Sequence, residues 1–263
     1  MKPAESTPAN RALTWSFGGG TQSVAIAVLV AEGKLPTPER VVIADTGYEA
    51  SETWEYMDRY VQPLLASVDR EVEIAPRTLA TTNGLRGKNG DLLLPVFTSD
   101  GGKLPTLCSN EWKKRVVGRW LRKRGYGPKN PVRMWIGISV DEVHRAKPSG
   151  VAWQEYHWPL LLDLPTRRHE CRLIVEDAGL PTPPRSSCWM CPHRNNEEWT
   201  HLRDNYPKDW RRAVRVDRAA RAVDGKGGVF LHRSRLPLDE VPIDAPTDQS
   251  DMFDGCDSGF CFV

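Results

Sequence analysis

Residues 12–23, ALTWSFGGGTQS, lie near the start of the 263-residue chain and indicate its fold class. Its first half is apolar and typical of a buried strand, and the residues from Thr21 to Glu32 predict a helix opened by a hydroxyl residue. Three glycines let the backbone approach an anion closely, while the helix N-terminus directs unpaired N–H groups and a positive dipole toward it. We therefore expect a phosphate group at this turn.

A Gly-rich connection between a strand and a helix can also be no more than a tight turn. Here the hydroxyls of Ser16, Thr21 and Ser23 add donors for an anion, which favours phosphate binding. The candidate nucleotide-binding residues of the turn are Ser16, Phe17, Gly18, Gly19, Gly20, Thr21, Gln22 and Ser23.

Around this turn, short β-branched runs alternate with helical segments, which is the pattern of a parallel sheet covered by helices. Strands are expected at residues 12–17, 41–45, 71–75 and 133–139, and helices at 21–32, 51–68 and 111–124. The fold class is therefore α/β, with a nucleotide-binding domain over residues 11–160 and a disordered lead-in over residues 1–10.

The remaining sequence has a different texture. Residues 76–110 form a long Gly-rich connection, for which we expect a lid. From residue 161 to 263 we predict a mostly helical C-terminal extension, with helices at 167–178, 195–205 and 208–223 and a small β element at 228–232. Its tail carries two cysteines and is expected to fold back onto the body.

Composition limits the class of protein. The hydrophobic fraction of 40% and the charged fraction of 27% are ordinary for a globular chain, and no window approaches the roughly 20 apolar residues of a membrane span. The N-terminus has no apolar run of the secretory kind, so a cytoplasmic location with no membrane partner is expected. In a reducing cytoplasm, the six cysteines favour metal or redox chemistry over disulfides.

Positive charge gathers between residues 111 and 124, where seven basic residues face one acid. A nucleic acid is the anionic partner that such a helix suits, and a solvated face balanced by the acidic tail is the alternative. The candidate contacts are Lys113, Lys114, Arg115, Arg119, Arg122, Lys123 and Arg124.

The pair Cys188 and Cys191, followed by a proline, can turn two thiolates toward one metal. Tetrahedral ligation needs four donors, and the other candidates are Cys108, Cys171, Cys256 and Cys261, with His193 a weaker one. Cys171 lies within a predicted helix and is interpreted as part of the core.

The turn at residues 16–23 resembles the PP-loop, the SGGxDS signature of enzymes that split ATP to AMP and pyrophosphate and of the related sulfonucleotide reductases. This resemblance implies a Rossmann-like sheet of the HUP type, as in the adenine nucleotide alpha hydrolase-like proteins. Gln22 stands where the family has Asp. The metal-binding role of that carboxylate is expected to pass to Asp45, which opens a segment similar to the family's DTGxE. A turn or cap residue is the alternative for Asp45.

Two further segments extend the resemblance. Residues 108–113 look like the family's C(T/S)xxxK, and residues 137–145 look like its GxRxxExxxR. The resemblance thus implies that Lys113 and Arg145 contact phosphate or sulfate and act with Asp45 in catalysis. A surface cation without a specific role is the alternative for Lys113.

The chain is also similar to DNA-phosphorothioation sulfur-insertion subunits and to phage-encoded, reductase-like proteins. That similarity implies a 4Fe–4S iron-sulfur cluster held by Cys108, Cys188 and Cys191, with Cys261 as fourth ligand and Cys256 as its alternative. A Zn²⁺ site made from the same thiols is the main rival, and a dithiol redox pair is a third interpretation.

The function expected from these features is adenylation. ATP with Mg²⁺ would bind at the turn, a substrate oxygen would be adenylated with release of pyrophosphate, and sulfur from a donor protein would then displace AMP, modifying a nucleic acid or a nucleotide. Two alternatives remain open. One is a sulfonucleotide reductase acting on adenosine-phosphosulfate, and the other is a non-catalytic nucleotide sensor with a structural metal site.

Overall fold

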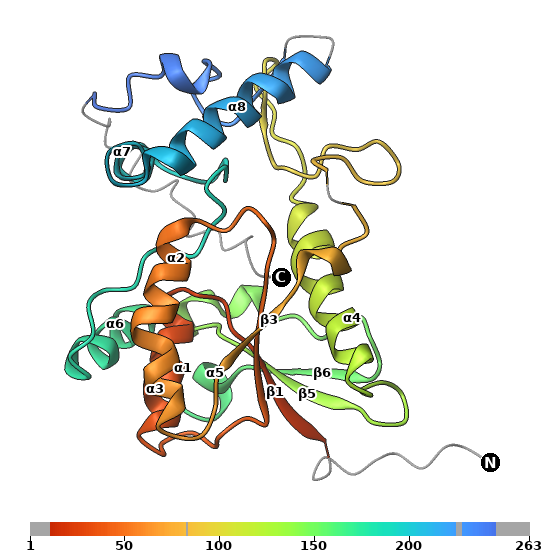
Figure 1. Ribbon diagram of the computed structural model, residues 1–263, viewed down its shortest axis with the longest axis vertical. Coiled ribbons are helices and arrows are strands. Elements are labelled where there is room, and N and C mark those ends of the chain that lie inside the picture. Colours follow the sequence, from red (N-terminus) through yellow and green to blue (C-terminus); the bar gives the residue numbers. More distant parts are fainter. Residues whose placement is uncertain (1–10, 83, 225–227, 246–263) are drawn as a thin grey trace. The chain divides into compact units, whose positions relative to one another are not determined.

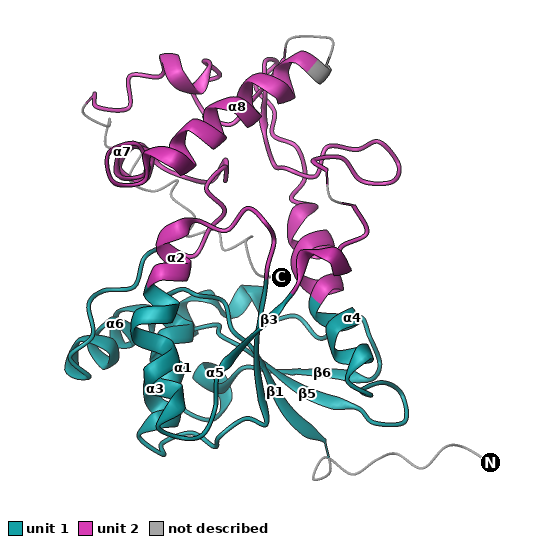
Figure 2. Cartoon of the chain, viewed as in Figure 1, with its two compact units in different colours: residues 1–44, 56–75, 117–184 teal, residues 45–55, 76–116, 185–263 magenta. Residues whose placement is uncertain are grey.

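The computed structural model describes residues 11–82, 84–224 and 228–245 (Figure 1). The chain divides into two compact units, which Figure 2 shows in two colours. Unit 1 contains residues 1–44, 56–75 and 117–184, and unit 2 contains residues 45–55, 76–116 and 185–263. Each unit is thus assembled from three separated stretches of sequence.

Unit 1 is built on a five-stranded parallel sheet, which confirms the predicted α/β class and fits a Rossmann-like fold. Its strands are β1 (Ala12–Ser16), β2 (Arg40–Ala44), β3 (Val72–Ala75), β5 (Val132–Ile136) and β6 (Gln154–His157). Four of them lie where β-branched runs predict them. β6 was not predicted, because the polar sequence of this edge strand carries no apolar alternation.

The strand order of this sheet is β3-β2-β1-β5-β6. From β1 the chain adds β2 and β3 on one side and later β5 and β6 on the other, so the order reverses between β1 and β5. Ligands of open α/β sheets bind at the carboxyl ends of the strands at such a reversal. The turn after β1 and the residues after β5 both lie at this position.

Helices α1 (Thr21–Ala31) and α6 (Arg168–Asp177) pack against each other in unit 1, and α3 (Gln62–Ala66) also contacts α1. In Figure 1 these three lie on one side of the sheet. Residues 24–30 of α1 are all nearly inaccessible to solvent. α1 is therefore a core helix, and the position of its N-terminus is fixed by packing.

Two predicted helices contain a π-helical turn. Helix α2 (Ser51–Tyr56) continues through such a turn at Met57–Val61 into α3, whose second residue, Pro63, has no N–H group to donate. The predicted helix at 111–124 likewise begins as a π-helical turn at Asn110–Lys114 and continues as α4 (Arg115–Lys123). A short helix, α5 (Pro159–Leu162), and a 3-10 turn at Val140–Arg145 complete the helical segments of unit 1.

Unit 2 contains α7 (Asn196–Asn205) and α8 (Pro207–Asp224), close to the predicted bounds, and a two-stranded antiparallel sheet. That sheet pairs β4 (Phe97–Thr98) with β7 (Val229–Phe230), and 3-10 turns lie at Arg77–Leu79 and Leu238–Glu240. Within the described ranges, no helix of either unit is long and apolar enough to cross a membrane.

The core of unit 2 includes residues from the long connection at 76–110. Leu93, Leu94 and Val96 are buried there together with Trp199 and Leu202 of α7. The middle of the connection is therefore a packed layer of unit 2, and the expectation of a lid is wrong for this part. The tail cysteines, Cys256 and Cys261, lie outside the described residues.

Candidate functional site

The turn after β1 has a backbone suited to an anion. Gly19 has a φ of 79°, a left-handed conformation that glycine adopts at no steric cost. Gly20 caps α1 in an extended conformation without a side-chain hydrogen bond, and the first turn of this 11-residue helix carries no acid. Among the described residues, no side-chain cap therefore competes with an anion at this helix N-terminus.

One hydroxyl of the turn closes it internally. The backbone N–H of Gly18 donates to Ser23 Oγ at 2.9 Å, and Ser23 is buried. The Ser23 hydroxyl hydrogen remains available to a ligand, because only the oxygen is used as an acceptor in this bond. The structure thus brings the predicted residues 16–23 together in one turn and shows that Ser23 also has a structural role.

Gln22, which replaces the family's Asp, faces a buried carboxylate. Its Nε2 donates to Glu142 Oε2 at 2.7 Å, and Glu142 Oε1 accepts a hydrogen bond from Arg145 Nη1 at 2.7 Å. An aspartate at position 22 would instead place a second negative charge beside Glu142. Glu142 was not among the predicted site residues, although it is the Glu of the segment that resembles GxRxxExxxR.

Arg145, predicted as an oxyanion contact, has its charge balanced by Glu142. The two side chains are only 9% and 8% exposed, and Arg145 Nε has no hydrogen-bond partner among the described residues. Removing either partner of such a buried pair is costly, because the other charge stays behind without compensation. Contact between Arg145 and a phosphate remains a prediction.

The residues after β5 lie directly against the first turn of α1. A Cβ atom added to Gly137 would lie 3.4 Å from Ser23 Oγ and 3.4 Å from Ile26 Cδ1. Position 137 therefore lies within van der Waals distance of the first turns of α1. Beyond it, Ser139 is fully buried, and its Oγ has no hydrogen-bond partner in the described part of the chain.

Asp45 directly follows β2 and takes part in a turn. Its Oδ1 accepts a hydrogen bond from the N–H of Gly47 at 2.7 Å, as the turn interpretation of this residue anticipated. Gly47 has a φ of 69°, and a Cβ there would lie 2.3 Å from Arg77 Nη1. The Arg77 guanidinium in turn stacks on the ring of Tyr48. Metal binding by Asp45 stays a prediction.

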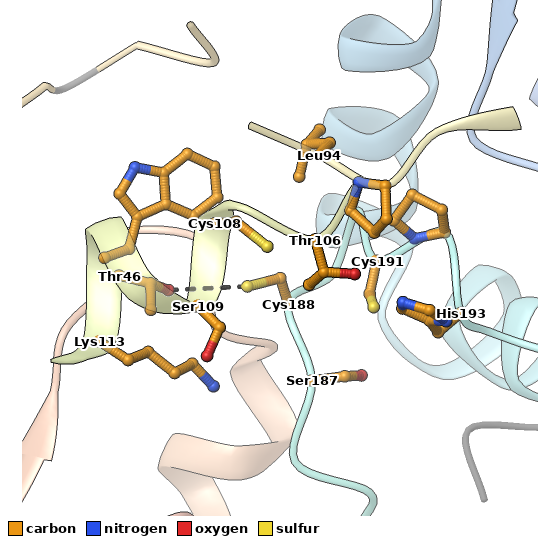
Figure 3. Close-up of a pocket in the computed structure, with 13 residues that line it drawn as sticks. Thr46, Leu94, Thr106, Cys108, Ser109, Lys113, Ser187, Cys188, Cys191 and His193 are labelled. Carbon is orange, nitrogen blue, oxygen red and sulfur yellow. Dashed lines mark hydrogen bonds between the residues drawn. The ribbon is translucent and has the colours of Figure 1, made fainter. Parts of the chain in front are cut away.

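Three of the four predicted metal ligands line one pocket of unit 2, shown in Figure 3. Cys188 is placed by backbone pairing, because the N–H of Trp189 donates to the Tyr48 carbonyl and that of Ala50 to the Ser187 carbonyl. Cys191 donates its N–H to the Cys188 carbonyl in a tight turn. The other lining residues are Thr46, Leu94, Pro95, Thr106, Cys108, Ser109, Trp112, Lys113, Ser187, Pro192 and His193.

Lys113, the predicted phosphate contact, lines the pocket and forms a buried ion pair. Lys113 Nζ lies 3.5 Å from Glu49 Oε2, and the two side chains are 17% and 2% exposed. Ser186 Oγ donates to Glu49 Oε1 at 3.3 Å. Lys113 is thus a pocket residue, and the interpretation as a surface cation is wrong. Glu49, its partner, was not predicted as a site residue.

Burial favours the protonated form of two thiols of the pocket, those of Cys108 and Cys188. Burial raises the pKa of Cys108 to about 12, and the nearby Cys191 adds to the rise. Burial also raises the pKa of Cys188 well above its usual value, with a further contribution from Glu49. The sulfur of Cys188 lies 3.8 Å from Thr46 Oγ1, the contact drawn dashed in Figure 3.

His193 is poorly placed to act as a metal ligand. Its Nδ1 lies 3.0 Å from Lys103 Nζ, and burial together with Lys103 and Arg185 lowers its pKa to about 4. A neutral imidazole that accepts from an ammonium at Nδ1 carries its proton on Nε2, which then has no lone pair for a metal. The geometry therefore favours a cysteine as the fourth donor.

In residues 11–82, 84–224 and 228–245, no three His, Cys, Asp or Glu side chains are arranged to hold a metal ion. The open space in the cysteine pocket is about 30 Å³, room for one or two water molecules. Thiol groups are suitable metal ligands, but the three cysteine side chains of the pocket would have to move closer together to bind one ion.

Cys171 lies in α6 and is fully buried, as its interpretation as a core residue predicts.

Several of the basic residues predicted to bind nucleic acid have intramolecular partners. Arg115 pairs with Glu111 at 2.5 Å, and Arg124 pairs with Glu73 at 3.1 Å. The guanidinium of Arg122 lies over the ring of Trp153. Nucleic-acid binding by residues 113–124 remains a prediction.

The reversed strand order and the glycine turn at the end of β1 define unit 1 as a Rossmann-like α/β unit. A scan against models of known protein families finds no match, and a search of curated proteins finds no significant match. The case for a function therefore rests on the residues of the turn and of the cysteine pocket.

The contact between Gln22 and Glu142 can be tested by a double-mutant cycle of Gln22→Asp and Glu142→Gln. Gln22→Asp should lower the free energy of unfolding by about 1–2 kcal/mol at pH 7, because it replaces a donor by a second carboxylate. The loss should shrink as the pH falls and one carboxyl group becomes protonated. In the double variant the two effects should couple by about 1 kcal/mol, as measured by urea unfolding. Strictly additive effects would contradict the contact.

Proposed function

We propose that this protein binds an adenine nucleotide at the turn of residues 16–23 and uses ATP to adenylate an acceptor for sulfur transfer. The observation that carries the proposal is the N-terminus of α1, where Gly19 is left-handed and no side chain caps the helix. The reversal of strand order next to β1 supports it, since this is where α/β sheets bind ligands. The resemblance of residues 16–23 to a PP-loop supplies the choice of nucleotide.

In the proposed reaction, an oxygen of the acceptor attacks the α-phosphorus of ATP. The bond from that phosphorus to the bridging oxygen breaks, and pyrophosphate leaves with the electron pair. A sulfur nucleophile from a donor protein then displaces AMP from the adenylated acceptor. The chain contributes mainly position and charge, because backbone N–H groups of the turn would orient the phosphates. Mg²⁺ would neutralise phosphate charge, with Asp45 as its proposed ligand.

Glu142 does not take the place of the Asp that the family has at position 22. Its two oxygens are already bonded to Gln22 and Arg145, and its side chain is 8% exposed. A carboxylate with both oxygens occupied offers little to a metal ion. Asp45 therefore stays the proposed Mg²⁺ ligand, and in the described part of the chain its side chain forms one hydrogen bond, with the N–H of Gly47.

We further propose that Cys108, Cys188 and Cys191 hold a metal together with Cys261, which lies outside the described residues. The raised pKa of Cys108 and of Cys188 argues against a dithiol redox pair, because protonated thiols are poor nucleophiles. The resemblance favours a 4Fe–4S cluster, and a single Zn²⁺ ion held by the same thiols is the rival. When bound, either group would compensate the charge of the thiolates.

Two alternatives make different demands on the same sites. A sulfonucleotide reductase would use adenosine-phosphosulfate and a nucleophilic cysteine, and would release sulfite in the presence of thioredoxin. A nucleotide sensor would bind without turnover, and Gln22 in place of Asp is the feature that favours it.

Nucleotide binding is tested by Gly19→Ala, with Gly33→Ala as a matched control. Both glycines have positive φ, but Gly33 lies outside the turn and has open space around it. Backbone strain is therefore similar, whereas only Gly19→Ala places a methyl group in the proposed anion site. Isothermal titration calorimetry with ATP should show at least about a 10-fold weaker affinity for Gly19→Ala, or 1.4 kcal/mol. Equal affinities of both variants and the parent chain would remove the turn from the site.

Catalysis is tested by measuring AMP and pyrophosphate formed from ATP, with and without DNA, RNA or free nucleotides as acceptor. The proposal expects both products in equal amounts and a higher rate with one acceptor. Sulfite release from adenosine-phosphosulfate would support the reductase alternative instead. Tight nucleotide binding without either turnover would support the sensor.

The metal proposal is tested by anaerobic purification followed by iron, sulfide and zinc analysis of single Cys→Ser variants. Substitution of Cys108, Cys188 or Cys191 should remove most of the metal. Cys171→Ser is the matched control, because this thiol is also buried but belongs to α6 of unit 1, and it should retain the metal. Iron with equimolar sulfide would identify a cluster, and zinc without sulfide would identify the rival site. Metal content that is unchanged in all four variants would contradict both.

A further inference from the structure

Helix α8 of unit 2, labelled in Figure 1, exposes a row of positively charged residues that was not among the predicted nucleic-acid contacts. Lys208, Arg211, Arg215 and Arg218 recur every three or four residues, which places them on one face of the helix. All four are exposed. Ten residues separate the first from the last, so the row is about 15 Å long at the rise of an α-helix.

The opposite face of α8 is buried in the core of unit 2. It carries Ala213 and Ala220, and the two acids Asp209 and Asp217 also lie on this face, where they are 1% and 0% exposed. Asp217 accepts hydrogen bonds from the backbone N–H groups of Leu231 and Leu238. The acids of residues 207–217 therefore point into the fold, and the exposed row keeps its positive field.

Within residues 11–82, 84–224 and 228–245, most of the charge in this row has no counter-ion. Among the described residues, the side chains of Lys208, Arg211 and Arg215 form no ion pair or hydrogen bond. Arg218 lies 3.1 Å from Asp239, but this pair is well exposed, with side chains 70% and 37% accessible. Exposed pairs of this kind contribute little and exchange readily with other anions. By contrast, Arg115 of α4 and Arg124, which directly follows this helix, are paired with Glu111 and Glu73.

We propose that this face of α8 binds the phosphate backbone of a polynucleotide. Successive phosphates of one strand advance about 3.4 Å along a duplex, so the row is about as long as four nucleotides. Three of its four cations are arginines, whose planar forks suit phosphate oxygens. A membrane surface fits less well, because an interfacial helix inserts its apolar face and that of α8 is buried in the core.

This proposal rests on the proposed function in one respect, because the bound polynucleotide would be the acceptor that is adenylated. Binding itself needs neither ATP nor turnover. Failure of the proposed function would appear in the calorimetry with ATP, whereas failure of this inference would appear in titrations with polynucleotide alone. The two outcomes are therefore separable.

The test uses the full chain and measures fluorescence anisotropy of labelled duplex DNA, single-stranded DNA and RNA over a range of salt concentrations. Two variants each remove half of the row, Lys208→Gln with Arg211→Gln and Arg215→Gln with Arg218→Gln. Each pair should weaken binding at least about 10-fold at 0.1 M salt. On duplex DNA, each should also lower the slope of log K against log salt by about 2, since every lost phosphate contact contributes about 0.9.

The matched control is Lys129→Gln with Arg172→Gln, which removes one lysine and one arginine that are also exposed but belong to unit 1. It has the same net charge as each test variant and should keep the parent affinity within about 2-fold. Circular dichroism confirms that all variants are folded. An unchanged salt slope in both α8 variants would overturn the proposal. Equal loss in the control, or equally tight binding to polyglutamate or anionic vesicles, would overturn it too.

Discussion

Glu142 is a buried carboxylate that holds the turn after β1 against the residues after β5. One of its oxygens accepts from Gln22 in the first turn of α1, and the other pairs with Arg145. A buried pair of this kind adds little net stability, but losing one partner costs several kcal/mol because the remaining charge is left uncompensated. The direction in which α1 presents its N-terminus therefore depends on this one carboxylate and on the packing of the helix.

The sequence allowed four of the five strands and the glycine turn to be predicted, because their signals are local. Buried parallel strands appear as β-branched runs, and a phosphate turn appears as glycines between a strand and a helix. The partner of Gln22 could not be predicted in this way, since 120 residues separate it from Glu142 and no periodic pattern links them. β6 escaped prediction because it is a polar edge strand.

The cysteine pocket shows the same limit. Spacing identified Cys188 and Cys191, and the resemblance added Cys108, but neither indicated Glu49, which pairs with Lys113. Glu49 lies close to Lys113 because the segment around Glu49 pairs with the residues around Cys188. Both segments are irregular, so sequence patterns do not reveal that they pair. The predicted domain boundary near residue 160 stays a prediction. The compact unit that contains the C-terminal part, unit 2, also includes residues 45–55 and 76–116.

The two buried cations that were predicted to contact phosphate each have a carboxylate of their own. Arg145 faces Glu142 and Lys113 faces Glu49, so each would offer an incoming anion less attraction than an uncompensated charge. The first turn of α1, by contrast, contains no acidic residue. In the proposed function, phosphate recognition therefore falls mainly to the backbone of the turn. A site of this kind tolerates Gln22 in place of an acid, because its attraction for an anion comes from peptide dipoles and not from the side chain at that position.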